Sequence, residues 1–132
     1  MIRQVIYLPA SDWTLVVFYL AGAMDADEIL RVLRRKGCSD DSLARAEDNL
    51  RSGMQDTGLT YSNPSRRTTI MVIGEASSPS ELWNTIDHEK GHASQHIASA
   101  LGIDYRSEEQ QYLTGEITSK MYPVARLLVC GS

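Results

Sequence analysis

The order of hydrophobic and polar residues predicts two β-hairpins, each followed by a pair of helices. In the first hairpin the segments "RQVIYLP" (3–9) and "WTLVVFYLA" (13–21) are rich in β-branched and aromatic residues, and "PASD" forms the turn between them. The second hairpin lies within 57–74, where "SNPS" is the turn and "TTIMVIG" (68–74) is the stronger strand. Together these strands predict a small antiparallel or mixed sheet.

Capping residues mark the first predicted helix pair. Asp25 can cap a helix in which Glu28 completes a capping box, and Gly37 ends it. A second helix follows within 39–54, where the apolar residues recur on one side. Its other side carries charged residues and is expected to face water.

The second helix pair has equally clear limits. Ser78 is the expected cap of a helix in which Glu81 is the capping-box acid and Gly102 the terminator. A last helix is expected to begin after Ser107 and to bend or end at Pro123, because proline cannot donate the helical hydrogen bond. The apolar residues beyond Pro123 are expected to form either helix or strand.

These elements predict one α+β domain over residues 1–132, with helices packed on the sheet. The net charge of −4 argues against nucleic-acid binding as the main task. The apolar run 13–23 is too short to span a bilayer and lacks the charged start of a signal peptide, so we expect no membrane partner and a cytoplasmic location. In that compartment Cys38 and Cys130 are expected to be reduced thiols.

The chemically informative segment is "DHEKGHASQHI", which contains every histidine of the chain. His88 and His92 are four residues apart and therefore share one face of the predicted helix. Two imidazoles at this spacing can bind one Zn²⁺ ion, and Glu89 can act as the general base, which is the logic of the His-Glu-x-x-His pattern. The alternative is an ordinary polar helix face. The strand upstream and the carboxylates downstream favour the metal site.

A catalytic zinc ion needs a third protein ligand beside its open position. The candidates are Glu108, Glu109, Glu116 and His96. His96 lies one further turn along the same helix, about 6 Å beyond His92, which makes it a poor ligand for an ion held by the first two histidines. Glu116 is more typical of a surface or supporting acid, so the glutamates that open the last helix are preferred.

The motifs "DHEKGH" and "SEEQQYLTGEI" together resemble small single-domain zincin-like metallopeptidases of the gluzincin type, often carried by phages and mobile elements. The resemblance covers residues 70–118. It implies a minimal zincin-like fold with His88, His92 and Glu108 as zinc ligands and Glu89 as the base. Gln111 stands where the family has alanine, so Glu109 remains the alternative to Glu108.

The resemblance also implies that segment 68–74 is an edge strand that pairs with an extended substrate; a core strand is the other interpretation. Further residues could assist the site. Tyr105, Tyr112 and Tyr122 are candidate donors to an oxyanion, and Asp87 and Asp104 are candidates to orient the imidazoles, although packing or surface roles are more common for each. Met71, Trp83 and Met121 are assigned to the core.

The sequence therefore predicts a zinc-dependent metallopeptidase with a peptide or protein substrate. Its rival is a non-catalytic interaction protein with a structural or vestigial zinc site. The small size supports this rival, because a chain of 132 residues has little room for a second lobe around a cleft. A zinc-free helical adaptor is the third hypothesis.

Overall fold

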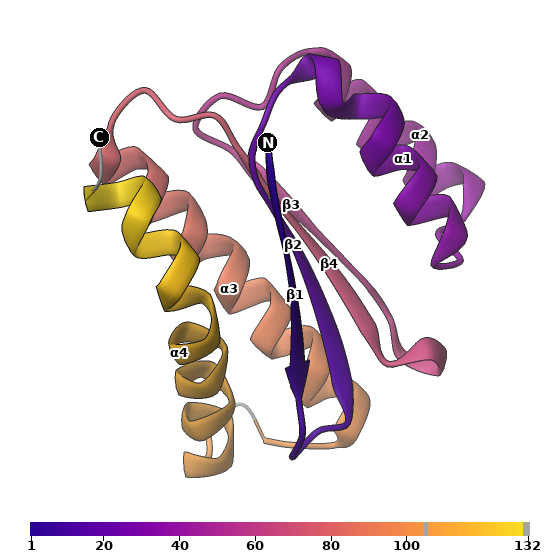
Figure 1. Ribbon diagram of the computed structural model, residues 1–132. Helices are drawn as coiled ribbons and strands as arrows, with labels where there is room; N and C mark the ends of the chain where they lie inside the picture. Colours follow the sequence, from indigo (N-terminus) through magenta and orange to yellow (C-terminus); the bar gives the residue numbers. More distant parts are fainter. Residues whose placement is uncertain (105, 131–132) are drawn as a thin grey trace.

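Four strands form a mixed sheet that carries a pair of helices on each face (Figure 1). The computed structural model describes residues 1–104 and 106–130, without the side chain of Cys130. Within this part the strands are β1 (Ile2–Leu8), β2 (Trp13–Ala21), β3 (Gly58–Asn63) and β4 (Thr68–Gly74), in the order β1-β2-β4-β3. The pairs β1/β2 and β3/β4 are antiparallel, whereas β2 and β4 are parallel. The predicted α+β class and both predicted hairpins are confirmed.

The two helix pairs lie on opposite sides of the sheet. Figure 1 shows α1 (Ala26–Arg35) and α2 (Asp40–Arg51) on one side, and α3 (Pro79–Leu101) and α4 (Glu108–Cys130) on the other. The 3₁₀ turn η1 (Ala23–Asp25) precedes α1, and a second 3₁₀ turn, η2 (Pro64–Arg66), joins β3 to β4. Within the described residues, no helix is both long and apolar enough to cross a membrane.

Strands β2 and β4 are almost entirely buried and mostly apolar because both of their faces are covered. Along β2, Leu15, Val17 and Tyr19 belong to the core beneath α3 and α4. The alternate residues Val16 and Phe18 belong to a second core beneath α1 and α2. This arrangement explains why the sequence there is continuously hydrophobic instead of alternating.

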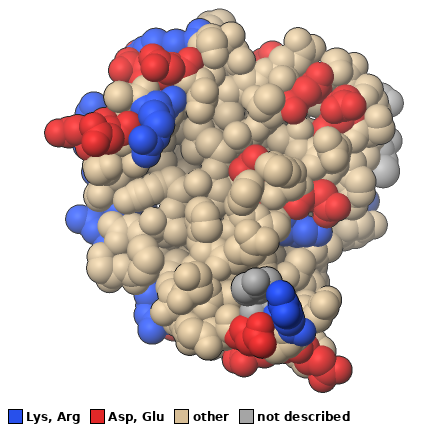
Figure 2. Space-filling model, turned by 180° about the vertical axis from the view of Figure 1, so that it is seen from behind, with Lys and Arg blue, Asp and Glu red and all other residues tan. Residues whose placement is uncertain are grey.

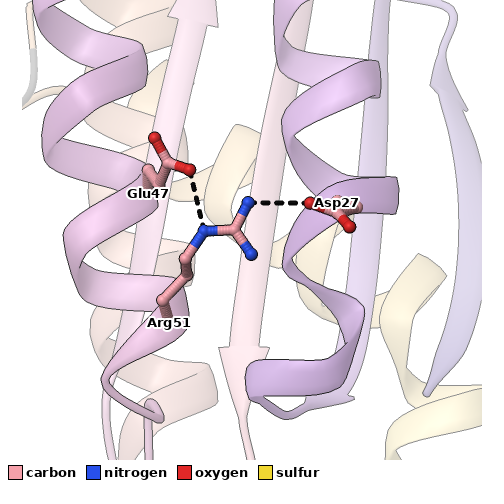
Figure 3. A network of polar contacts seen from close by, with 3 residues as sticks. All are labelled: Asp27, Glu47 and Arg51. Atoms are coloured by element: carbon pink, nitrogen blue, oxygen red, sulfur yellow. Dashed lines mark hydrogen bonds and ion pairs between the residues drawn. The ribbon is translucent and has the colours of Figure 1, made fainter.

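Packing and one exposed polar network hold α1 beside α2. Arg51 donates to Asp27 of α1 and to Glu47 of its own helix, each at 2.7 Å (Figure 3). Asp27 and Arg51 keep large exposed fractions, so solvent screens the ion pair and we expect it to contribute little to stability. The buried leucines of both helices, Leu30, Leu33, Leu43 and Leu50, supply the main attraction.

Several predicted boundaries are corrected. Helix α4 continues through Pro123 to Cys130, so the apolar residues beyond the proline are helical. The Asp25 side chain accepts from the Gly22 amide at 2.8 Å and stabilises the 3₁₀ turn before α1, in place of the expected cap on α1 itself. Met71 and Met121 are buried as predicted, but Trp83 is 46% exposed, so its assignment to the core was wrong.

Candidate functional site

Helix α3 carries the predicted motif and has the expected ends. The Ser78 hydroxyl accepts from the Glu81 amide at 3.2 Å, and Gly102 closes the helix with φ of +70°, a conformation that favours glycine. These local signals define a helix long enough to place the whole histidine segment in one rigid element.

His88 and His92 lie together on the solvent-exposed side of α3. Their Nε2 atoms are 3.1 Å apart, and the rings meet edge to face with centroids 4.6 Å apart. Two tetrahedral zinc ligands with Zn–N bonds near 2.0–2.1 Å would have their nitrogens about 3.3 Å apart. The predicted sharing of one helix face is confirmed. The 3.1 Å contact is a hydrogen-bond distance between the two rings, and it is also close to the spacing that a shared zinc ion requires.

Glu89 is turned toward the sheet. Only 4% of its surface is exposed, and its Oε1 accepts a hydrogen bond of 2.8 Å from the Thr60 hydroxyl of β3. A Cβ at Gly58 would lie 2.7 Å from the Glu89 Cγ and 2.6 Å from the Val72 carbonyl oxygen, so only glycine leaves room there. Sequence reasoning missed Thr60 and Gly58, because nothing local to β3 indicates which helix will cover it.

His96 is held by a line of hydroxyl groups that runs across the sheet. The Ser62 hydroxyl lies 2.8 Å from His96 Nδ1 and 2.7 Å from the Thr69 hydroxyl, to which the Trp13 indole N–H donates at 2.9 Å. Burial lowers the pKa of His96, and the neighbouring His92 lowers it further. His96 Nδ1 thus contacts a sheet hydroxyl, in line with the expectation that His96 is a poor third zinc ligand.

These contacts join Trp13, Thr69, Ser62 and His96 into one line. The Trp13 indole can only donate, so the Thr69 hydroxyl accepts from it, whereas either partner can be the donor at the two contacts of Ser62. We name these four residues the hydroxyl relay.

The expected third ligand does not join the histidines in this structure. Among the described residues, no three His, Cys, Asp or Glu side chains lie where they could hold one metal ion. Helix α4 packs against α3 through Ser94, which Thr114 and Gln110 contact. Ser94 is two positions beyond His92, hence about 200° around the helix. The first turn of α4, with Glu108 and Glu109 exposed, therefore approaches α3 from another side.

Glu116, another candidate third ligand, also lies apart from the histidines. This residue is half-buried on α4, and its Oε1 is buried without a hydrogen-bond partner among the described residues. It forms no three-donor group with the histidines either.

The proposed supporting residues have other partners. Asp87 forms an ion pair with Lys90 at 2.8 Å, and the Asp104 carboxylate accepts from the Arg106 amide at 2.9 Å within the loop before α4. Tyr112 and Tyr122 project from α4 with 72% and 57% of their surfaces exposed. Tyr105 lies outside the described residues. In this structure neither aspartate orients an imidazole.

The strand beside the motif is not the one expected. Segment 68–74 forms β4, which has β2 on one side and β3 on the other, so it is a core strand. The edge strand next to β4 is β3, whose Thr60 and Ser62 contact α3, and β1 forms the opposite edge of the sheet. The expectation that 68–74 is an edge strand was wrong, because the second hairpin pairs with β2 through its second strand.

Comparisons with known proteins add nothing to this geometry: no family model, curated protein or solved structure matches the chain.

Proposed function

We propose that the protein is a zinc-dependent peptidase in which His88 and His92 are metal ligands and Glu89 is the general base. The observation that carries the proposal is the pair of imidazole Nε2 atoms, 3.1 Å apart on the exposed side of α3, with a buried carboxylate between them in sequence. The likeness of the two motifs to gluzincin-type metallopeptidases supports the same conclusion.

Bound zinc would supply a Lewis acid and a water molecule with a pKa near 7. The chain supplies the proton transfer: Glu89 takes the proton from the attacking water and delivers it to the leaving amine. The hydrogen bond from Thr60 fixes one carboxylate oxygen, which leaves the other free for this task. The free edge of β3 offers unpaired backbone groups to an extended peptide substrate.

Glu108 is the third ligand of the proposal, with Glu109 as the alternative. The packing of α4 gives neither glutamate geometric support as a zinc ligand, so measurements of metal binding must decide between them. We expect zinc content near one ion per chain in protein purified without chelator. It should fall sharply in His88→Ala and in His92→Ala, and it should fall in Glu108→Ala but not in Glu109→Ala. The opposite response of the two glutamates would transfer the ligand role to Glu109.

The decisive experiment for catalysis is the Glu89→Gln variant. It should fold, keep its zinc and lose cleavage of an unstructured test protein by roughly a hundred- to ten-thousand-fold, the usual cost of removing a general base. If zinc-loaded wild type cleaves nothing across a broad peptide library, or if Glu89→Gln cleaves as fast as wild type, the peptidase proposal fails.

One observation favours a second function. Because the described residues contain no three-donor group, a non-catalytic interaction protein with a vestigial zinc site requires no rearrangement of α4, whereas a structural zinc ion would require four protein ligands. Under this alternative Glu89→Gln binds the partner as wild type does, which separates the two functions.

A further inference from the structure

A small cavity opens beside the free edge of β3. It has a volume of about 250 Å³ and lies between α2 and α3. This is below the roughly 300–1,000 Å³ of sites for drug-sized ligands, so it suits a single side chain. The lining comes from every element near that edge: Leu33, Cys38, Ser42, Arg45, Ala46, Asn49, Leu59, Thr60, Tyr61, Ser62 and His96.

The position of the cavity matches the geometry of an added strand. Along β3, Thr60 and Ser62 face α3, whereas Leu59 and Tyr61 pack against the core beneath α1 and α2. A peptide paired with β3 would alternate its side chains in the same way. Side chains on one face would approach α3, and those on the other face would meet the cavity wall that α2 provides.

The polar part of this wall is cationic. Arg45 is exposed at the cavity, and its Nη2 has a long contact of 3.4 Å with the Ser42 hydroxyl. Among the described residues Arg45 forms no ion pair, and no Asp or Glu lines the cavity. The amide of Asn49 and the Ser42 hydroxyl add neutral donors, while Leu33, Ala46 and Leu59 supply apolar contact.

The distribution of charged side chains over the surface bears on how selective this cavity can be. Seen from behind, uncharged surface covers much of the middle of the molecule, but acidic groups also lie near the centre and in the right half (Figure 2). Basic and acidic groups together occupy the upper left, over α1 and α2. Among the described residues that line the cavity, Arg45 is the only Lys, Arg, Asp or Glu, so its guanidinium is the feature that would distinguish one side chain from another.

We propose that this cavity is a subsite for an acidic side chain of an extended peptide paired along β3. The inference rests on the proposed function for the identity of the peptide as substrate. Arg45 binds the carboxylate, Asn49 and Ser42 donate to it, and the apolar wall holds its methylene stem. The substrate class is then a peptide with Asp or Glu close to the scissile bond.

The test uses short labelled peptides in which Glu, Gln, Lys or Leu is placed at each position in turn on an uncharged background. Binding is measured by fluorescence anisotropy on Glu89→Gln, and cleavage by mass spectrometry on zinc-loaded wild type. At one position Glu should exceed Gln and Lys by about tenfold, the factor that a hydrogen bond to a charged group supplies. Arg45→Glu should transfer the preference to Lys, whereas Arg126→Glu, an exposed arginine on α4, should leave it unchanged.

The outcomes separate the subsite from the peptidase proposal. Peptides that bind or are cleaved without an acidic preference, or a preference that survives Arg45→Glu, would overturn the subsite and leave the peptidase intact. Selective binding without any cleavage would support the subsite and refute the peptidase. If none of the peptides binds, the subsite is refuted.

Discussion

Single residues around the motif act through contacts that reach across the sheet. Glu89 is fixed by Thr60, and His96 by the hydroxyl relay that begins at Trp13. The identities of the helix residues were predictable, because four-residue spacing alone puts His88 and His92 on one face. Their partners on β3 were not, since a contact between residues about thirty positions apart depends on which strand lies at the edge.

Substitution of Ser62 should destabilise the fold more than its partial exposure suggests. Ser62→Ala removes a hydrogen-bond partner from the Thr69 hydroxyl, which is fully buried, and from His96 Nδ1. We expect a loss of about 1–3 kcal/mol in the free energy of unfolding, measured by urea denaturation.

Ser65→Ala is the matched control, because Ser65 is exposed on η2 and bonds only within its own turn. It should change stability by less than about 0.5 kcal/mol. A double variant with Thr69→Val should cost less than the sum of the single changes, since both remove the same line of hydrogen bonds. Equal effects of Ser62→Ala and Ser65→Ala would refute the relay.

At the scale of elements, the ends of α3 were the easiest to predict and the sheet order the hardest. Ser78 and Gly102 delimit α3 by local chemistry, so the sequence alone was sufficient. The pairing of β2 with β4 joins strands far apart in the chain, and no local signal reports it. Helix α4 packs on α3 through apolar residues such as Ile97 and Ile117 and through the Ser94–Thr114 hydrogen bond, and this packing decides where Glu108 lies.

The glycine inside the motif offers a prediction about α3. Gly91 has no atom within 4 Å of where a Cβ would stand, and its backbone is helical. Gly91→Ala should therefore raise the free energy of unfolding by about 1 kcal/mol, the difference in helix propensity between the two residues.

Gly102→Ala is the comparison variant for Gly91→Ala, and the stability of both is measured by thermal and urea unfolding. Its site is equally open, but its φ of +70° strains any residue with a Cβ, so this variant should lose stability. A loss in Gly91→Ala as large as that in Gly102→Ala would contradict the placement of Gly91 on an open helix face.

At the scale of the whole molecule, hydrogen bonds that start at the Tyr19 phenol connect the sheet to α4. The Tyr19 hydroxyl donates to Gln4 Oε1 at 2.7 Å, and the Gln4 amide donates to the Lys120 carbonyl at 2.8 Å. Burial raises the pKa of Tyr19 far above its ordinary value of 10.0. The folded protein therefore keeps this proton at a pH where the unfolded chain releases it.

This difference predicts alkaline destabilisation. Below pH 10 the phenol is neutral in both states and its contribution is complete; above pH 10 the unfolded chain binds fewer protons, so stability falls as pH rises. Urea unfolding between pH 8 and about pH 11 should show a shallower decline in Tyr19→Phe than in wild type. Tyr122→Phe, which alters an exposed phenol, should follow the wild-type slope; identical slopes for all three proteins would refute the assignment.

The parallel pairing of β2 with β4 has a consequence for how the chain folds. Each hairpin is a local unit that can close quickly, but the segment from η1 to β3 must be looped out before the hairpins can meet. Loop closure of this length costs entropy before any contact offsets it, so we expect the union of the hairpins to lie near the rate-limiting step. Substitutions in the β2/β4 seam, such as Val17→Ala, should then slow folding more than substitutions within either hairpin turn.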